Sequence, residues 1–411
     1  MKQILQRVSD FAYPKACWFG LVMIFGVPWS HAFFYIGLVG MLACLLASPA
    51  YYRQSITACR ENSALLAILL FAYIAAGLIY TSAPIDLAIH DIKKYRKLLL
   101  IPVFLMLYRD TKWAYRVVVA YGCGALILMM PTMLDGTGLA NFLSLDLSRF
   151  QNISYSPETL VYWRNHIVHG FHASMLFAIC LLTAIRYRRL AWLFLAVAAI
   201  CAVNILFFIN GRIALITLLA VCLIMTISYI SSPRLRFGLL GAIFAASIFA
   251  YQFSGKIHAR IDSVAQEARV YMTDPGVKTS GGIRLNYWST SLGMFIEAPL
   301  FGKGPGAFRE NLLRLDNPLR TEPHKHAHNE YLTLLSQHGG VGLMLFLLLV
   351  RQVHLQAARQ DPWLKGVVRF GLVIFLINAM TDSSLNNESE GWTFVLLACL
   401  ANIRPAGADT A

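Results

Sequence analysis

Charged residues are scarce in this 411-residue sequence, at 14% of the total, and the acidic ones are fewer than the basic ones. A soluble domain carries about 25% charged residues, so the composition excludes an ordinary soluble protein. Hydrophobic residues make up 57% of the chain, and the mean hydropathy is +0.58. Apolar runs that are almost free of charge alternate with short polar connectors, a pattern typical of many membrane-spanning helices.

Three further absences narrow the possible classes of protein. The chain has eight cysteines, but seven lie within apolar runs, where cysteine behaves as a small hydrophobic residue, so we expect no disulfide framework. The phosphate-binding pattern G-x-x-x-x-G-K-[ST] is absent, also from the glycine-rich stretch 299–308, which disfavours an ATP-driven pump. The first apolar run has no small-residue cleavage site, so we expect no cleavable signal peptide.

The apolar runs predict an all-α polytopic membrane protein with about twelve transmembrane helices. Strands are disfavoured because the runs are continuous, and backbone in lipid must find its hydrogen bonds within its own segment. The predicted spans are residues 14–30, 32–49, 63–81, 97–109, 113–134, 166–186, 190–209, 213–231, 236–253, 331–352, 365–381 and 391–404.

Lysine and arginine predict the orientation of these helices. The net charge is +14, and six basic clusters, among them "RYRR" at 186–189 and "PRLR" at 233–236, fall in connectors on one side of the bundle. By the positive-inside rule this side is cytoplasmic, and so are both termini. Segments 82–96, 135–165 and 254–330 then lie on the external side. We attribute the positive charge to membrane insertion and expect no nucleic-acid partner.

Three parts follow from this topology: residues 1–253 with nine spans, an external loop at 254–330, and residues 331–411 with three spans and a short cytoplasmic tail. We expect the loop to fold as a small cap.

The cap contains "NYWSTSLGMFIEAPL" at 286–300, which predicts an amphipathic helix with Tyr287, Leu292, Phe295 and Ile296 on its apolar face. The segment from Gly302 to Gly306 that follows is expected to be flexible, because glycine tolerates backbone states that other residues avoid.

Three histidines alternate at the end of the external loop: His324, His326 and His328, directly before Asn329 and Glu330. In an extended backbone they would project to one side, a spacing that could bind zinc, although such a site normally holds its ligands rigidly. Alternatively, one histidine acts as a general base, because imidazole changes its charge near neutral pH. The third alternative is that they are polar residues at an interface. The pattern favours the base.

Other charged residues lie at the same predicted face. Arg212 begins the eighth span, Arg284 lies in the external loop, and Asp382 lies in the last external connector. A charge at membrane depth is costly and often marks a functional pathway, although an arginine at a helix end can also extend to lipid headgroups.

The segment "KKYRK" at 93–97 is basic and external, against the positive-inside rule, so it could hold lipid phosphates or anchor to headgroups. Its candidate binding residues are Lys93, Lys94 and Arg96.

Histidines also occur inside the predicted spans. His166, His169 and His172 share one helical face, which favours a polar lining over a metal site, and His338 lies within the tenth span.

The chain resembles the O-antigen ligase family of the bacterial inner membrane, through "GRIALI" at 211–216, "GGIRLNYWSTSLGMFIEAPLFGKGPGAF" at 281–308 and "HNEYLTLLSQHGGVG" at 328–342. In that family a large periplasmic loop ends in a His-Asn pair, and a glycine follows after nine residues, as Gly339 does here. The family pattern then has a threonine where this sequence has Gly342. O-antigen polymerases and protein O-oligosaccharyltransferases share the motif.

The resemblance implies a multi-span, GT-C-like glycosyltransferase with its active site at the periplasmic face. The donor would be undecaprenyl-pyrophosphate-linked O-antigen, and the acceptor a sugar hydroxyl of lipid A–core. Pyrophosphate is a good leaving group that needs only charge neutralisation, which guanidinium groups provide through paired contacts, so no metal and no cofactor are expected. His328 would be the base, with Asn329 or Glu330 orienting it, and a single displacement would invert the anomeric centre.

The candidate site residues fall into two groups. The catalytic candidates are His328, Arg212 and Arg284, and the substrate-binding candidates are Asn329, Glu330, His326, His324, His338, Lys93, Lys94, Arg96 and Asp382.

The competing class is a lipid or solute transporter, but transporters place ionisable groups near the bilayer midplane, whereas here they gather at one face. A structural subunit would leave the clustered histidines and arginines unexplained. The sequence therefore favours an enzyme, with membrane lipids as partners, and leaves the choice of acceptor open.

Overall fold

The computed structural model of the protein describes residues 2–49, 52–147, 163–209, 211–274, 277, 279–314 and 326–403. Throughout these residues the chain forms helices joined by short connections, and none of them lies in a strand. The continuous apolar runs explain this, because a helix satisfies its backbone hydrogen bonds within one segment. The predicted all-α polytopic membrane protein is confirmed.

Eight helical segments in the described chain are long and apolar enough to cross a membrane, and each coincides with one predicted span. They are α4 with η2 (Asn62–Ile79), α7 (Thr111–Gly136), α9 (His166–Arg186), η5 with α10 and η6 (Arg188–Phe208), α11 (Arg212–Tyr229), α12 (Pro233–Phe253), α16 (Glu330–Ala357) and α17 (Pro362–Ala379). The other four predicted spans coincide with shorter or less apolar helices: α1 (Lys2–Gly26), α2 (His31–Leu46), α6 (Ile101–Leu107) and α18 (Glu388–Leu400).

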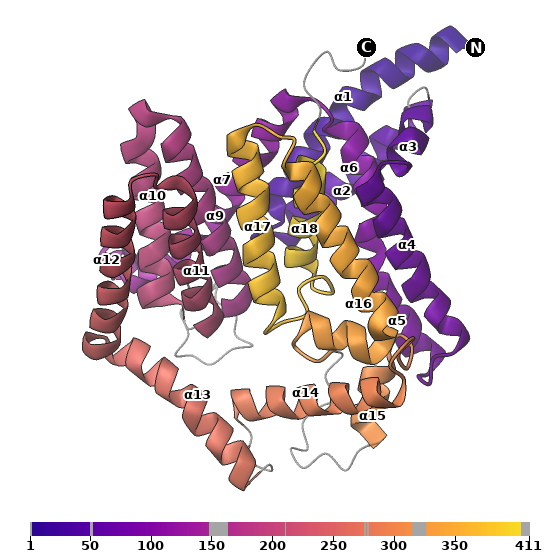
Figure 1. Cartoon of the computed structure of the whole chain (residues 1–411). Coiled ribbons are helices and arrows are strands. Elements are labelled where there is room, and N and C mark those ends of the chain that lie inside the picture. Colours follow the sequence, from indigo (N-terminus) through magenta and orange to yellow (C-terminus); the bar gives the residue numbers. More distant parts are fainter. Residues whose placement is uncertain are drawn as a thin grey trace.

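Burial differs strongly between these helices. In α9, 94% of the apolar stretch is buried inside the protein, whereas none of α12 is. Figure 1 shows α9 within the bundle and α12 at its rim. Every side chain of α12 along this stretch is therefore available to lipid, while α9 carries residues of the core.

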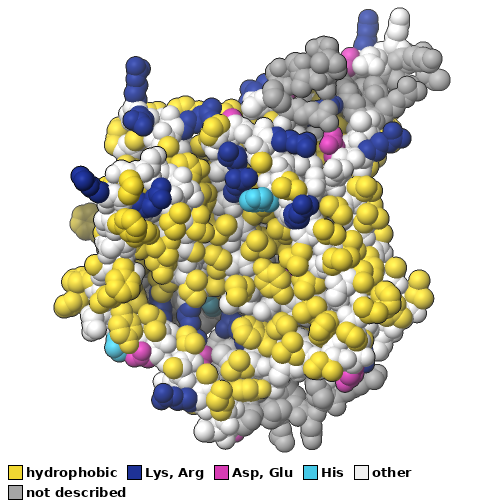
Figure 2. Space-filling model, in the orientation of Figure 1, with side chains coloured by type: hydrophobic (Ala, Val, Ile, Leu, Met, Phe, Trp, Pro, Cys, Tyr) yellow, Lys and Arg dark blue, Asp and Glu magenta, His cyan; other side chains and the backbone are white. Residues whose placement is uncertain are grey.

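The two ends of the bundle have different compositions. Both termini lie at one end, and α13 (Gly255–Thr273), α14 (Ser280–Glu297) and α15 (Ala307–Arg314) lie across the other (Figure 1). Lys and Arg side chains gather toward the end with the termini, above a broad hydrophobic belt (Figure 2). This arrangement agrees with the predicted grouping of connectors, while the sidedness in a membrane remains a prediction.

The predicted amphipathic helix of the cap is present as α14, but its apolar residues do not share one face. Tyr287 is 1% exposed and packs with Phe308 of α15, whereas Ile296 is 76% exposed and Leu292 is 46% exposed. α14 thus turns Tyr287 and Met294 to the protein and presents its other apolar residues outward.

The glycine-rich turn after α14 corrects the expectation of a flexible segment. Gly302, Gly304 and Gly306 have φ values of 70°, 91° and 78°, in the left-handed region. A Cβ at Gly302 would lie 2.4 Å from the carbonyl carbon of Gln337, and one at Gly304 would lie 2.4 Å from Cα of Thr81. The Gly304 N–H donates to the Gln337 carbonyl at 2.9 Å. The glycines allow close packing here and do not form a loose hinge.

Candidate active site

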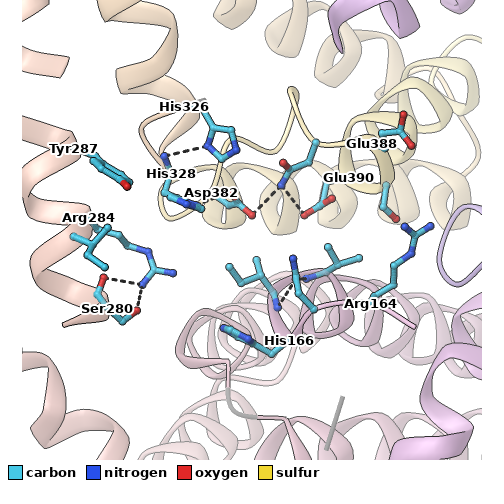
Figure 3. A pocket seen from close by; sticks show the side chains of 16 residues that line it. Arg164, His166, Ser280, Arg284, Tyr287, His326, His328, Asp382, Glu388 and Glu390 are labelled. Atoms are coloured by element: carbon cyan, nitrogen blue, oxygen red, sulfur yellow. Dashed lines mark hydrogen bonds and ion pairs between the residues drawn. The ribbon is translucent and has the colours of Figure 1, made fainter. Parts of the chain in front are cut away.

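A cavity of about 720 Å³ lies where the cap meets the bundle (Figure 3). It is lined by residues from the start of α9 and just before it, from α14, from the segment before α16, from the connection between α17 and α18, and from the first turn of α18. Its volume lies within the range of about 300–1,000 Å³ that is common for ligand sites. The side chains that line it are mostly polar or charged, and they include the predicted His328, Arg284, His326 and Asp382. These predicted residues are spread over the sequence from Arg284 to Asp382, so the fold brings them together.

His328 and Asp382 form the central pair of this cavity. Nδ1 of His328 lies 3.3 Å from Oδ1 of Asp382. The Asp382 carboxylate also accepts hydrogen bonds from the Ser383 N–H at 2.8 Å and from Nδ2 of Asn387 at 2.9 Å. The Tyr287 ring stacks beside the imidazole, with centroids 6.2 Å apart and planes 11° from parallel. The orienting partner of His328 is therefore Asp382, where the sequence suggested Asn329 or Glu330.

The Asp382 carboxylate is ionised despite being only 3% exposed. Burial by itself would raise its pKa, but the hydrogen bond with His328 and the charges of His326 and His328 lower the pKa to about 2. An imidazole whose Nδ1–H faces an ionised carboxylate has Nε2 as the atom that can exchange a proton with a ligand.

His328 has a backbone φ of 50°, which is rare for a residue with a side chain. Such strain costs about 1–3 kcal/mol and is found most often at functional sites. Its neighbour Asn329 begins α16: the Asn329 carboxamide oxygen accepts from the Leu332 N–H at 3.1 Å, and Nδ2 donates to the Met380 carbonyl at 3.0 Å. Asn329 therefore fixes the backbone on which His328 sits, and its amide is occupied by the protein.

Gly339 interrupts α16 ten residues after Asn329, with φ 65° and ψ −170°. A Cβ there would lie 2.2 Å from the carbonyl oxygen of Leu300, so only glycine lets the turn after α14 cross the helix at this point. The glycine of the His-Asn motif thus has a physical reason: it joins the cap to the helix that begins at the site.

Arg284 is the cation on the cap side of the cavity. Its Nη1 donates to Oγ of Ser280 at 2.8 Å, while the buried Nε has no hydrogen-bond partner in the described residues. Burial lowers the pKa of Arg284 from its ordinary value, Asp382 opposes this change, and the nearby Arg212 adds to it. A partly buried guanidinium with an unused N–H is suited to binding an anion.

Arg212 lines a second cavity of about 390 Å³, which shares His166 and Arg284 with the first. Its guanidinium forms an ion pair with Glu267 of α13, with Nη1 3.2 Å from Oε2. Glu267 also accepts from the Gly281 N–H at 2.6 Å. Burial opposes ionisation of Glu267, but the hydrogen bond and charge of Arg212 lower its pKa. The two arginines thus lie on adjoining cavities, and Glu267 was not found from the sequence.

The remaining histidines of the motif differ in position. His326 lines the main cavity, and its Nδ1 accepts from the His328 N–H at 3.3 Å. His324 lies outside the described residues. His338 is 0% exposed and packs edge to face against Tyr95 with ring centroids 6.1 Å apart, away from the residues that line the cavity.

Glu330 is 0% exposed, and its carboxylate points into the protein. It accepts from the N–H groups of Leu385 at 2.9 Å and Asn386 at 3.3 Å. Lys97 of η3 (Arg96–Leu100) holds the same stretch from the other side, because its Nζ donates to the carbonyl oxygens of Asn386, at 3.3 Å, and Asn387. These two buried side chains fix the connection that carries Asp382.

The three predicted binding residues in the basic segment 93–97 have different surroundings. Lys93 is exposed, Lys94 lies 3.4 Å from the Asp91 carboxylate, and Arg96 lies 3.9 Å from the Glu388 carboxylate at the rim of the cavity. Of the three predicted binding residues in this segment, Arg96 lies nearest to a residue that lines the cavity.

Sequence reasoning missed three charged residues that line the cavity, Arg164, Glu388 and Glu390, whereas His166 lines it as a polar residue, in agreement with the prediction. The polar string "TDSSLNNESEG" at 381–391 could have indicated that the two glutamates belong to the site, because it separates two apolar spans. Arg164 had no signal beyond its place before a predicted helix.

His326, His328 and Asp382 form a group that could hold a metal ion, since one donor atom from each lies within 4.8 Å of the others. Two imidazoles and one carboxylate are a donor set that zinc accepts. However, the Nδ1 of His328 lies at hydrogen-bond distance from Asp382, which equally suits a histidine–carboxylate pair.

Comparison with known proteins adds one finding. Residues 197–347 match the family model described as O-Antigen ligase, a region that runs from α10 into α16 and includes Arg212, Arg284, His328 and Gly339. No curated protein matches the chain. The family match agrees with the resemblance found in the sequence motifs.

Proposed function

Because residues 197–347 match the O-antigen ligase family model, we propose that this membrane protein transfers O-antigen from undecaprenyl pyrophosphate to a sugar hydroxyl of lipid A–core. The transfer would occur at the periplasmic face of the bacterial inner membrane. The observation that carries the proposal is the meeting of the His328–Asp382 pair and Arg284 on one cavity.

In the proposed step the acceptor hydroxyl attacks the anomeric carbon of the donor sugar. A new C–O bond forms, the bond from that carbon to the pyrophosphate oxygen breaks, and the electron pair leaves with the lipid pyrophosphate. Nε2 of His328 takes the hydroxyl proton, and ionised Asp382 stabilises the imidazolium that results. One displacement inverts the anomeric configuration.

The guanidinium groups neutralise the charge that develops on the leaving group. Arg284 lies on the main cavity, and Arg212 on the adjoining one. For Arg212 to contact the pyrophosphate, the anion must share or replace its ion pair with Glu267. A paired contact from two arginines takes the place that a divalent cation has in many enzymes that use nucleotide sugars.

The test is transfer by the purified full chain in lipid nanodiscs, with lipid-linked O-antigen as donor and lipid A–core as acceptor. We expect a ligated product in EDTA and without ATP. If transfer required an added divalent metal, the cluster of His326, His328 and Asp382 would be a metal site and the base mechanism would fail.

The acceptor is tested in the same assay. Elongation of the lipid-linked glycan in the absence of core would identify a polymerase, and glycosylation of an added protein would identify a protein O-oligosaccharyltransferase. Movement of the donor lipid across the bilayer without any transfer would support a transporter and overturn the proposal. In cells, deletion of the gene should leave lipid-linked polymer accumulating and O-antigen absent from the core.

A further inference from the structure

The main cavity has two ends, and the mechanism above uses only one. Figure 3 shows Arg284 and Arg164 on opposite sides of the cavity, with Asp382 and His166 between them. Arg284 comes from the cap, whereas Arg164 comes from the residues just before α9. Arg164 has a different set of neighbours, and these neighbours indicate a different ligand.

Arg164 takes part in a chain of alternating charged and polar groups. Its Nη1 lies 2.6 Å from Nε2 of His31, and the other ring nitrogen of His31 lies 3.8 Å from the Glu388 carboxylate. Glu388 in turn accepts a hydrogen bond from the Tyr35 hydroxyl at 3.4 Å and lies 3.9 Å from Arg96. Donors and acceptors therefore alternate along this wall, unlike the mainly cationic end at Arg284.

Two buried polar atoms at this end have no hydrogen-bond partner in the described residues: Nε of Arg164 and Oε2 of Glu390. Glu390 is 0% exposed, lines the cavity, and binds Asn387 only through Oε1, at 3.3 Å. A buried donor or acceptor left unpaired costs about 1–3 kcal/mol, and such atoms are rare unless something else pairs them. A ligand with both donors and acceptors, such as one rich in hydroxyl groups, would satisfy both atoms.

An aromatic cluster stands beside Arg164. The rings of Trp163 and Trp29 are 5.4 Å apart, and Trp29 lies 5.3 Å from Phe33. Trp163 also has a φ of 58°, so strained backbone occurs on both sides of the cavity, here and at His328. The electron-rich face of an indole attracts the C–H face of a sugar ring, and carboxylates accept from its hydroxyls.

The direction of the reaction assigns this end to one substrate. In a single displacement the nucleophile enters opposite the leaving group. With the pyrophosphate at Arg284, the acceptor hydroxyl must approach from the far side of the anomeric carbon, which is the side of Arg164. The base His328 lies between the two ends, where it can reach the hydroxyl proton.

We propose that the Arg164 end of the cavity, formed by Arg164, Glu388 and Glu390 beside Trp163, binds the oligosaccharide that carries the acceptor hydroxyl. The assignment of this glycan as the acceptor rests on the proposed function, whereas the binding of a glycan at this end does not. In this site Arg164 donates to sugar hydroxyl oxygens, and the glutamates accept from sugar hydroxyls.

The kinetic test compares Arg164→Gln and Glu390→Gln with the unchanged full chain in nanodiscs. Initial rates are measured against acceptor at saturating donor, and against donor at saturating acceptor. We expect the KM for acceptor to rise about 10–100-fold, the loss that follows from removing a hydrogen bond to a charged group, with the KM for donor within twofold. Arg116→Gln is the matched control, because Arg116 packs over Trp113, 4.6 Å from the ring, and does not line the cavity.

A second measurement is independent of turnover. Core oligosaccharide without lipid is titrated against the protein in the absence of donor, and tryptophan fluorescence reports binding near Trp163. Loss of binding in Arg164→Gln at unchanged melting temperature supports the site even if no transfer is seen. Transfer with unchanged acceptor KM and unchanged binding in both variants overturns the inference while leaving the proposed function intact. A rise in donor KM alone would assign this end to the donor glycan and also overturn it.

Discussion

Replacing Asp382 with asparagine removes one charge from the site and leaves its shape unchanged. The carboxylate accepts three hydrogen bonds: from His328 at 3.3 Å, from the Ser383 N–H at 2.8 Å, and from Asn387 at 2.9 Å. An asparagine has one oxygen and one NH₂ group. In either amide orientation its NH₂ faces a donor, so at least one hydrogen bond becomes a repulsive contact.

The magnitude follows from the pKa of Asp382, which lies at about 2 instead of the ordinary 3.8. This difference corresponds to about 2 kcal/mol of stabilisation of the folded protein. Because the pKa is lowered on folding, the stabilisation is complete above pH 3.8 and is lost as the pH falls through about 2. Asp382→Asn should therefore lower the melting temperature at neutral pH, by at most the equivalent of about 2 kcal/mol, because part of the pKa shift comes from the charged forms of His326 and His328.

The loss of activity should be larger than the loss of stability. The imidazolium that forms when His328 takes a proton would have no ionised partner, and in comparable histidine–carboxylate pairs the same change lowers kcat by up to about 10⁴-fold. We expect a fall in kcat of about 10²–10⁴-fold, with the KM for donor within threefold. Purified protein in nanodiscs, assayed at a temperature where the variant is fully folded, separates the two effects.

Asp361→Asn is a matched control for this change. Asp361 also forms an ion pair, 2.6 Å from Arg186, and it caps α17 at the opposite end of that helix. The Asp361→Asn variant should lose some stability and keep the kcat of the unchanged protein. If Asp382→Asn keeps kcat within threefold of the unchanged protein, Asp382 does not support His328 as the base.

Three other substitutions test other parts of the site. Arg284→Lys keeps the charge but loses the planar fork, so kcat/KM should fall about 10–100-fold in the transfer assay; unchanged activity would mean that charge alone suffices. Gly339→Ala places a Cβ 2.2 Å from a carbonyl oxygen and should lower the melting temperature, whereas Gly238→Ala, with nothing within 4 Å, should not. Lys97→Met leaves two buried carbonyl groups without their donor and should lower both stability and kcat, whereas Lys93→Met at an exposed position should be neutral.

The sequence predicted the helices well because hydropathy acts locally. Each predicted apolar run lies on a helix, including the short fourth run, which forms η3 and α6. Long-range packing was not predictable in this way. The turn from Gly302 to Gly306 looked flexible by composition, but its glycines are there because Thr81 and Gln337, far away in the sequence, approach its backbone.

The candidate site was predicted only in part, because residue types and motifs are visible in the sequence whereas long-range contacts are not. His328 and Arg284 were found because their residue types and motif suggest chemistry, and both line the cavity. That Asp382 orients His328 could not be read from the sequence, since 54 residues separate them. Glu330, next to the motif, seemed a better partner by position. It begins a helix whose turn directs its side chain to the protein interior instead.

The burial of Glu330 and Lys97 suggests why polar residues surround this cavity without all contacting a substrate. The connection between α17 and α18 has no regular structure, so its backbone N–H and C=O groups need partners from elsewhere. Glu330 supplies the acceptor for two N–H groups, and Lys97 supplies the donor for two carbonyl groups. Hydrogen bonds from buried polar side chains to the backbone require a narrow geometry, and leaving such a group unpaired is costly. Such a clamp fits a connection that has to hold Asp382 at a fixed distance from His328.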